Sequence, residues 1–200
     1  MKLHPNRCLL LGNLKDMEAV HIEAMVNFLL KPAGRKLCLP RELRLSTEYG
    51  RLVLSLAETS LCPLPSLDEE VTLNIPGDTE LSGWKVKAEI FQERVEVCNE
   101  ENNGFTACFD LDKAGTQLLV RRRQRGDRFQ PLGMRQFKKL QDFMIDAHIP
   151  RSWRDRVPVL CSPQHVLWVV GWRIDERVKV TKSTQKTLKV QFSRSSSCVL

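Results

Sequence analysis

Residues 118–133 read LLVRRRQRGDRFQPLG, and the character of the chain changes within this stretch. The apolar run Leu118–Val120 predicts a short strand. Five arginines follow within residues 121–128, and the glycine and proline residues around and after them predict an irregular loop. Because the planar guanidinium group matches phosphate oxygens, several arginines on one loop can follow a phosphodiester backbone. We interpret the stretch as a strand that leads into a phosphate-binding loop, with an ordinary solvated charged loop as the alternative.

The charge of the chain is distributed unevenly about this stretch. The 200 residues have a net charge of +7, but residues 1–120 contain 13 basic and 18 acidic side chains. Residues 121–200 contain 18 basic and 6 acidic ones, a net charge of +12. This asymmetry favours a polyanionic partner for the second part, and RNA, DNA and anionic lipid all fit it. No apolar run approaches the ~18 residues of a membrane-spanning helix, so none is expected.

The rest of the basic part and the residues before it are predicted to be rich in strands. Apolar residues at every second position of residues 84–90 predict a strand with one solvent-facing side. The five apolar residues Val166–Val170 predict a buried strand. Apolar residues at helical spacing predict a helix over residues 135–148, which ends before Pro150. Shorter strands are expected at residues 71–75, 105–109, 178–180 and 188–190.

The front of the chain is predicted to contain one helix and a few short strands. Apolar residues repeat at helical spacing within residues 14–30, at Ile22, Met25, Val26 and Leu29. Residues 43–56 alternate around the turn Tyr49-Gly50 and predict a β-hairpin. So few elements make a small core, and we therefore assign residues 1–58 to the end of a larger helical domain.

A linker is expected at residues 59–70, which contain two prolines and the acidic run Asp68–Glu70. Residues 71–200 then form a β-rich C-terminal domain with one or two packed helices. The expected fold class of the whole chain is α+β.

Further basic residues are candidates for the same phosphate-binding surface. Lysines at the start of the predicted 135–148 helix oppose the helix dipole, and a bound phosphate would relieve that cost. An aspartate after a glycine can accept backbone N–H bonds, so Asp127 is expected to hold the arginine loop, with Gly126 and Gly133. Trp153 is the candidate for stacking on a base, with core packing as the alternative, whereas Trp168 is expected in the core. The candidate phosphate ligands are Arg121, Arg123, Arg125, Arg128, Lys138, Lys139, Arg154 and Arg156.

Catalytic and metal sites are poorly supported by the sequence. The four histidines are scattered, and no zinc-protease, hydrolase or Walker motif occurs. The seven cysteines include no C-x-x-C pair, so we expect most of them to be small buried residues in a reducing cytoplasm. Asp175-Glu176, beside Arg173 and Arg177, is interpreted as a salt-bridged turn rather than an acid–base pair.

Four ordered blocks of the basic part closely resemble the C-terminal domain of bacterial tRNA(Ile)-lysidine synthases. The resemblance covers residues 118–190 and is specific, because the sequence, order and spacing of the blocks all agree. Weaker similarity to the end of the family's helical middle domain occurs between His21 and Leu52. The blocks are R-x-R-x-x-G-D-R-F-x-P-L-G at 121–133, K-K-L-x-D-F-x-I-D-A-x-I-P at 138–150, R-D-R-x-P-V-L at 154–160 and L-W-V-x-G-W-R-I-D-E-R-x-K-V-T at 167–181.

The resemblance implies a function in tRNA modification. Members of this family use ATP to adenylate the wobble cytidine of a minor isoleucine tRNA, and the amine of free lysine then displaces AMP. In the family, the C-terminal domain grips the tRNA around its acceptor stem. The resemblance therefore implies a bacterial, cytoplasmic, tRNA-binding chain, with ATP and magnesium as cofactors of the full-length enzyme.

One hallmark of the family, the S-G-G-x-D-S loop of its ATP-pyrophosphatase domain, has no counterpart in the 200 residues. We therefore expect the chain to correspond to the C-terminal portion of such an enzyme, as a fragment, a split subunit or the product of a displaced start. On this reading it holds no cofactor of its own and is inactive as a ligase alone. The alternative is a non-catalytic interaction module that docks on a separately encoded catalytic partner.

Overall fold

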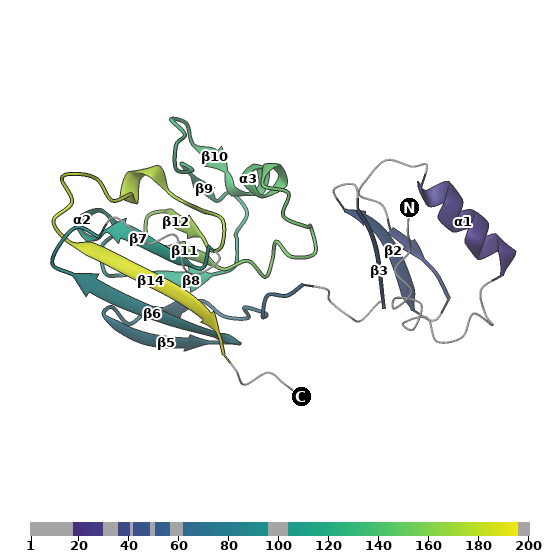
Figure 1. The fold of residues 1–200 in the computed structure, drawn as a ribbon, viewed down its shortest axis with the longest axis horizontal. Coiled ribbons are helices and arrows are strands. Elements are labelled where there is room, and N and C mark those ends of the chain that lie inside the picture. Colours follow the sequence, from purple (N-terminus) through teal and green to yellow (C-terminus); the bar gives the residue numbers. More distant parts are fainter. Residues whose placement is uncertain are drawn as a thin grey trace. The chain divides into compact units, whose positions relative to one another are not determined.

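The computed structural model describes residues 18–29, 36–40, 42–48, 51–56, 62–95 and 104–195. The chain divides into two compact units, Met1–Leu61 and Cys62–Leu200, which are drawn in Figure 1. Both units contain helix and antiparallel strand. The expected α+β class is therefore confirmed.

The first unit consists of a helix and a three-stranded sheet. The helix is α1 (Ala19–Leu29), and the antiparallel strands β1 (Lys36–Cys38), β2 (Leu43–Glu48) and β3 (Arg51–Leu56) pair in that order. β2 and β3 form the predicted hairpin, with Leu43 opposite Leu56. Of the predicted helix, residues 14–17 and 30 lie outside the described residues.

The apolar face predicted for this helix is largely exposed. Phe28 is the buried side chain of α1, and it packs in a small core with three leucines of the sheet region. Ile22, Val26 and Leu29 are each about half exposed. The spacing of apolar residues therefore identified the helix but only part of its buried side, because the packing contacts come from Phe28 and from Met25, which is partly buried.

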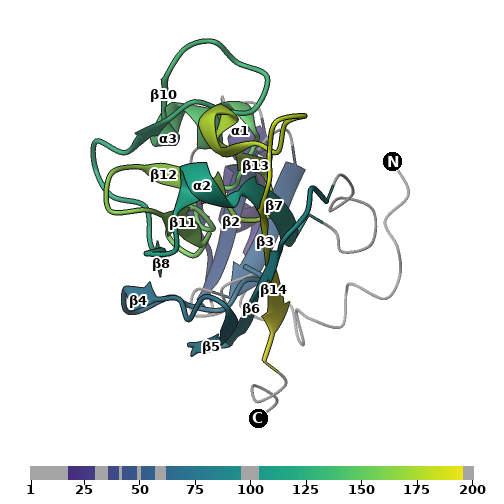
Figure 2. The same cartoon turned by 90° about the vertical axis from the view of Figure 1, so that its left-hand side faces the viewer.

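The second unit is built mainly from short antiparallel strands. One sheet has four strands, the other has five, and a separate pair of strands precedes the helix of residues 140–146. The elements in chain order are β4 (Val71–Thr72), β5 (Gly77–Leu81), β6 (Trp84–Phe91), β7 (Thr106–Asp110), α2 (Leu111–Ala114), β8 (Leu119–Arg121), β9 (Arg128–Phe129), β10 (Lys138–Lys139), α3 (Leu140–Asp146), β11 (Val159–Cys161), β12 (Val166–Val169), β13 (Arg173–Ile174), η3 (Glu176–Val178) and β14 (Thr187–Arg194). The four-stranded sheet has the order β5-β6-β14-β7 and the five-stranded sheet the order β13-β12-β11-β8-β4. Figure 2 shows both sheets, with β10 and α3 at one end of the unit.

Aromatic side chains from both sheets meet in the core of the second unit. The ring centroid of Trp168 on β12 lies 5.5 Å from that of Phe192 on β14 and 6.0 Å from that of Phe109 on β7. Phe192 also packs edge-on against Trp84 on β6, at 5.9 Å. All four side chains are buried. Edge-to-face contacts of this kind stabilise the packing of the two sheets, and Trp168 occupies the core position expected for it.

The residues expected to form a linker contribute to the second unit. Leu64 and Leu67 are buried in its core. The Arg122 guanidinium donates through Nε to the Leu67 carbonyl and through Nη2 to Asp68, at 2.6 Å. Residues 62–70 are therefore attached to the strands that follow, and the proline-rich composition alone does not reveal this packing.

Two elements of the basic part differ from the sequence prediction. The predicted helix over residues 135–148 is confined to α3, because Lys138 and Lys139 form β10 and pair with Phe129 and Arg128 of β9. The two lysines therefore lie in a strand directly before the helix. Residues 176–178, at the start of the expected 178–180 strand, form the 3₁₀ turn η3 instead.

The cysteines of the described residues differ in their environments. Cys161 is buried and unpaired, and burial raises the pKa of its thiol to about 12, so it stays protonated as a small core residue. Cys62 is half-buried and Cys38 is exposed. Cys108 is disulfide-bonded, which corrects, for this residue, the expectation of reduced cysteines.

Candidate nucleic-acid interface

The arginine loop of residues 121–128 is organised by the carboxylate of Asp127. Arg121 donates to it from both terminal guanidinium nitrogens, at 2.8 and 2.9 Å. The Gln124 backbone N–H donates to Asp127 Oδ2 at 2.7 Å, and the Leu140 N–H donates to the Asp127 carbonyl at 2.9 Å. Gly126 has a φ of 96°, a conformation that glycine adopts without strain. One aspartate therefore fixes the end of β8, the turn and the start of α3.

Arg121 is consequently held within the fold. Its side chain is 14% exposed and that of Asp127 is 11% exposed. The hydrogen bonds to Asp127 raise the pKa of Arg121 above its ordinary value. The two groups satisfy each other, so the structure places Arg121 as a support of the loop and not as a free phosphate ligand.

Four further candidates also have acceptors within the protein. Arg123 Nε donates to Asp155 at 2.8 Å, and Lys138 pairs with Asp146. Arg154 Nε donates to the Ile149 carbonyl at 3.0 Å. Arg156 donates to the Leu64 carbonyl at 3.5 Å. A phosphate that binds Arg123 or Lys138 would therefore have to displace the carboxylate of Asp155 or Asp146.

Three candidates are exposed and make no side-chain hydrogen bond or ion pair with the part of the chain that the structure describes. They are Arg125 in the turn, Arg128 on β9 and Lys139 on β10. Arg128 and Lys139 are directly opposite each other in the β9–β10 pair. These cations are therefore presented to solvent by elements whose backbones are fixed by strand pairing and by Asp127.

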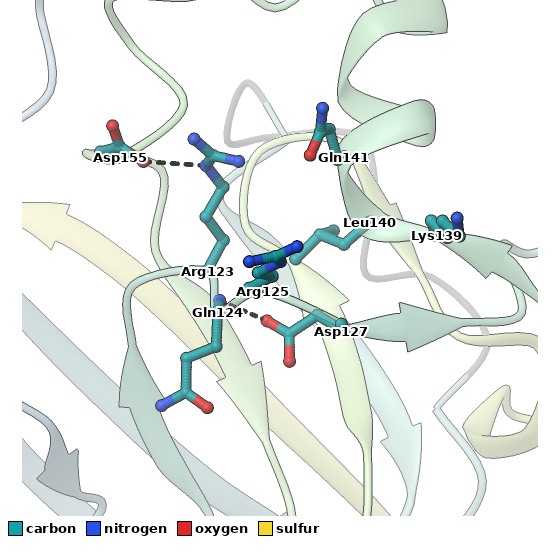
Figure 3. A pocket seen from close by; sticks show the side chains of 9 residues that line it. Arg123, Gln124, Arg125, Asp127, Lys139, Leu140, Gln141 and Asp155 are labelled. Carbon is teal, nitrogen blue, oxygen red and sulfur yellow. Dashed lines mark hydrogen bonds and ion pairs between the residues drawn. The ribbon is translucent and has the colours of Figure 1, made fainter.

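A pocket of about 440 Å3 opens between the arginine loop and the start of α3. Figure 3 shows the loop side chains on one side, Gln141 and Lys139 on the other, and the Arg123–Asp155 ion pair at the edge. Its lining residues are Arg123, Gln124, Arg125, Gly126, Asp127, Lys139, Leu140, Gln141 and Asp155. Three basic and two acidic side chains line it, and the carboxylate of Asp127 is neutralised by Arg121. The pocket can therefore accept an anionic group such as a phosphate.

A second pocket, of about 540 Å3, lies on the other side of the same loop and includes Arg121, Arg128 and His165. Burial and the charge of Arg177 lower the pKa of His165, so this ring is neutral at pH 7. The positive charge beside the loop therefore comes from arginine and lysine, which stay charged across the physiological pH range.

A second acidic residue, Asp175, holds the loop that follows β9. Its side chain is completely buried, and it accepts from the Gln130 N–H at 2.8 Å and from the Arg177 guanidinium at two positions, both at 2.8 Å. The Glu176 carboxylate accepts from the Gly133 N–H at 2.8 Å. Burial would raise the pKa of Asp175, but the hydrogen bonds from Arg177 and Gln130 outweigh it and lower the pKa. The interpretation as a salt-bridged turn is confirmed.

Some residues of this surface were not predicted from the sequence. Asp155 and Gln141 line the pocket, and Phe137 is a largely exposed aromatic residue just before β10. Trp153, the expected stacking candidate, is half-buried and packs against the main core. Within the described residues no group of acidic, histidine or cysteine side chains is arranged to hold a metal ion, and no helix is long and apolar enough to span a membrane.

The arginine loop, α3 and the Asp175 turn all lie within one recognised domain, since residues 118–191 match the family model described as TilS substrate C-terminal domain. Residues 118–191 belong to the TilS substrate C-terminal domain family. A crystal structure of a TilS C-terminal domain agrees in fold, with a TM-score of 0.53 and 25% identity. The match covers 64% of this chain and all of that one.

Relatives that match most of this chain are tRNA(Ile)-lysidine synthases. The chain is 46% identical over 183 residues to the tRNA(Ile)-lysidine synthase of Dehalococcoides mccartyi and 36% identical over 185 residues to that of Caldanaerobacter subterraneus. Each match covers 92% of this chain but only 39% and 38%, respectively, of the relative. The chain therefore spans about two fifths of these synthases and corresponds to their C-terminal part.

The TilS C-terminal family match includes all eight candidate phosphate ligands and the three aspartates that pair with some of them, Asp127, Asp146 and Asp155. Residues 62–117, which contain three strands of the four-stranded sheet (β5, β6 and β7) and β4 of the five-stranded sheet, precede the matched region. The candidate interface therefore lies within the part of this chain that matches the family model.

Proposed function

We propose that the second unit binds tRNA, as the C-terminal tRNA-binding portion of a tRNA(Ile)-lysidine synthase. One observation carries the proposal: Arg125, Arg128 and Lys139 are exposed without a partner in the described structure, on a loop and strand pair that Asp127 and the β9–β10 pairing fix. Because the backbone that carries these cations is already fixed, binding to phosphates has to order only their side chains.

The charge of the region supports a nucleic acid as the ligand. Residues 121–200 have a net charge of +12, and each phosphate that a lysine or arginine neutralises releases counterions. Arg123 adds a further contact when a phosphate replaces Asp155. In this proposal, one phosphate of the RNA enters the pocket beside the loop. The neighbouring phosphates of the RNA backbone lie on the open surface around the pocket.

The activity of the whole enzyme is proposed from its relatives. In this proposal the chain acts in tRNA processing in the bacterial cytoplasm, and its substrate is a minor isoleucine tRNA. A catalytic domain, in the same protein or as a separate partner, uses ATP and magnesium to join lysine to the wobble cytidine. The described residues hold the tRNA, and we assign no cofactor to them.

The test is tRNA binding measured over a range of salt concentrations, with the whole chain and with the double variant Arg125→Ala/Lys139→Ala. If both residues contact phosphates, the log–log slope of affinity against salt becomes less steep by about 1.4 to 1.8. Lys182→Ala is the matched control, because Lys182 is exposed in the same basic part but lies outside the pocket. An unchanged slope in the double variant, or equal effects of the control, would contradict the proposal.

A further inference from the structure

Phe137 is an exposed aromatic side chain among positive charges. It is 54% exposed, and it directly precedes the lysines of β10. Its position in the sequence, within a predicted helix, gave no sign of this exposure. Removing an apolar ring from water is favourable, so a partner that covers Phe137 would gain free energy of binding. The groups around the ring indicate the chemistry of that partner.

One face of the Phe137 ring is already occupied. The guanidinium carbon of Arg177 lies 4.9 Å from the ring centroid, within the range of a cation–π contact. Arg177 is itself fixed by its two hydrogen bonds to Asp175, which is completely buried. The exposed area of the ring therefore lies away from Arg177, on a side chain whose orientation is set before any ligand binds.

Phe137 lies two residues before a free cation in the chain. Phe137 and Lys139 are exposed, whereas Lys138 between them is half-buried and pairs with Asp146. An aromatic ring and a candidate phosphate ligand are thus both exposed, two residues apart in the chain.

We propose that Phe137 is a stacking platform for an unpaired base of the bound RNA, next to a phosphate held by Lys139. This inference rests on the proposed tRNA binding and adds the kind of RNA element that the surface recognises. Aromatic rings and arginine planes stack on bases that are splayed out of a helix, and bases inside a duplex are not available for this. Trp153, which packs against the core, does not offer such a surface.

The experiment compares two RNAs that differ only in their bases. One is a short RNA duplex with a single-stranded 3′ extension of a few nucleotides. The other has the same extension made of abasic nucleotides, so the phosphates are kept and the bases are lost. Binding of the whole chain and its variants to both RNAs is measured by fluorescence anisotropy at one salt concentration.

Phe137→Leu is expected to weaken binding to the base-containing extension by roughly 5- to 150-fold, the effect of losing one stacked base. Its binding to the abasic extension should stay within about twofold of the unaltered protein, since no stacking is lost there. Phe137→Trp should keep the preference for bases. Ile145→Ala, another exposed apolar residue, is the matched control and should change neither affinity.

Other outcomes separate this inference from the proposed function. If Phe137→Leu lowers the affinity for both RNAs equally, or for neither, the stacking proposal is overturned. This includes the case in which the Phe137 ring contacts a protein partner instead of RNA. If Arg125→Ala/Lys139→Ala still alters the salt slope in that case, tRNA binding stands without the stacking. Thermal unfolding of each variant shows whether the loss of the Arg177 contact unfolds the loop, and Phe137→Trp tests stacking even then.

Discussion

At the scale of single residues, acidic side chains decide which arginines of the loop are available to a partner. Asp127 and Asp155 each bind one arginine, Arg121 and Arg123 respectively. The Arg121–Asp127 pair is shielded from water, whereas Asp155 is 66% exposed. Breaking a shielded pair leaves an uncompensated charge, and an exposed pair contributes little to stability. The two aspartates should therefore respond differently to the same substitution.

Asp127→Asn is expected to lower the free energy of unfolding by about 3 kcal/mol, because Arg121 is left half-buried without a counter-charge. The Gln124 N–H would still find an oxygen, so the loss reflects mainly the ion pair. Urea unfolding followed by circular dichroism measures the change. An unfolding midpoint equal to that of the unaltered chain would show that Asp127 does not hold the loop.

Asp155→Asn is expected to change the free energy of unfolding by less than about 1 kcal/mol. It removes the acceptor that competes with phosphate for Arg123, together with a negative charge at the pocket. RNA affinity should therefore rise several-fold at low salt, and the gain should shrink as salt is added. Weaker RNA binding by this variant would argue against a phosphate in the pocket.

The sequence predicted one of these two partners and not the other. Asp127 follows Gly126 within the loop, and turn chemistry predicts its backbone hydrogen bonds. Asp155 lies 32 residues from Arg123 in the chain, so only the folded structure brings the two together. For the same reason the sequence could not show that Arg121 is enclosed while Arg125 is free.

At the scale of elements, the sequence predicted those that a local pattern determines. The alternation of residues 84–90 became β6, and the hairpin of residues 43–56 became β2 and β3. Residues 135–139 were included in the predicted helix although its apolar face begins at Leu140, and pairing with β9 makes β10 of the last two. That contact, across the eight residues 130–137, overrides the local preference.

The 173–178 turn gives a prediction for pH dependence. Because the pKa of Asp175 is lowered in the folded state, its contribution to stability is present above the unfolded pKa and is lost as the pH falls below about 4. Asp175→Asn should therefore be less stable than the unaltered chain at pH 7, and the difference should narrow towards pH 3. Thermal unfolding midpoints at both pH values check this. A difference that is constant with pH would contradict the role of the carboxylate charge.

At the scale of the whole molecule, the position of the border between the two units decides which residues each unit needs for its core. The second unit includes Leu64 and Leu67 in its core, and its Arg122 binds the backbone of that segment. Among the described residues of the first unit, four apolar side chains are buried and most of the apolar helix face is exposed. Stability and RNA binding should therefore both belong to the second unit, provided that it keeps residues 62–70.

Two shortened chains test this border. A chain of residues 62–200 should keep the unfolding midpoint of the second unit and bind RNA with the affinity of the whole chain. A chain of residues 71–200 loses two buried leucines, each worth about 2 to 5 kcal/mol when removed from a core, and the acceptors of Arg122. It should unfold at a markedly lower temperature, and Leu67→Ala in the whole chain should reproduce about half of that loss. Equal midpoints for the two shortened chains would show that residues 62–70 are a passive connection, because the leucines would then contribute nothing to the core.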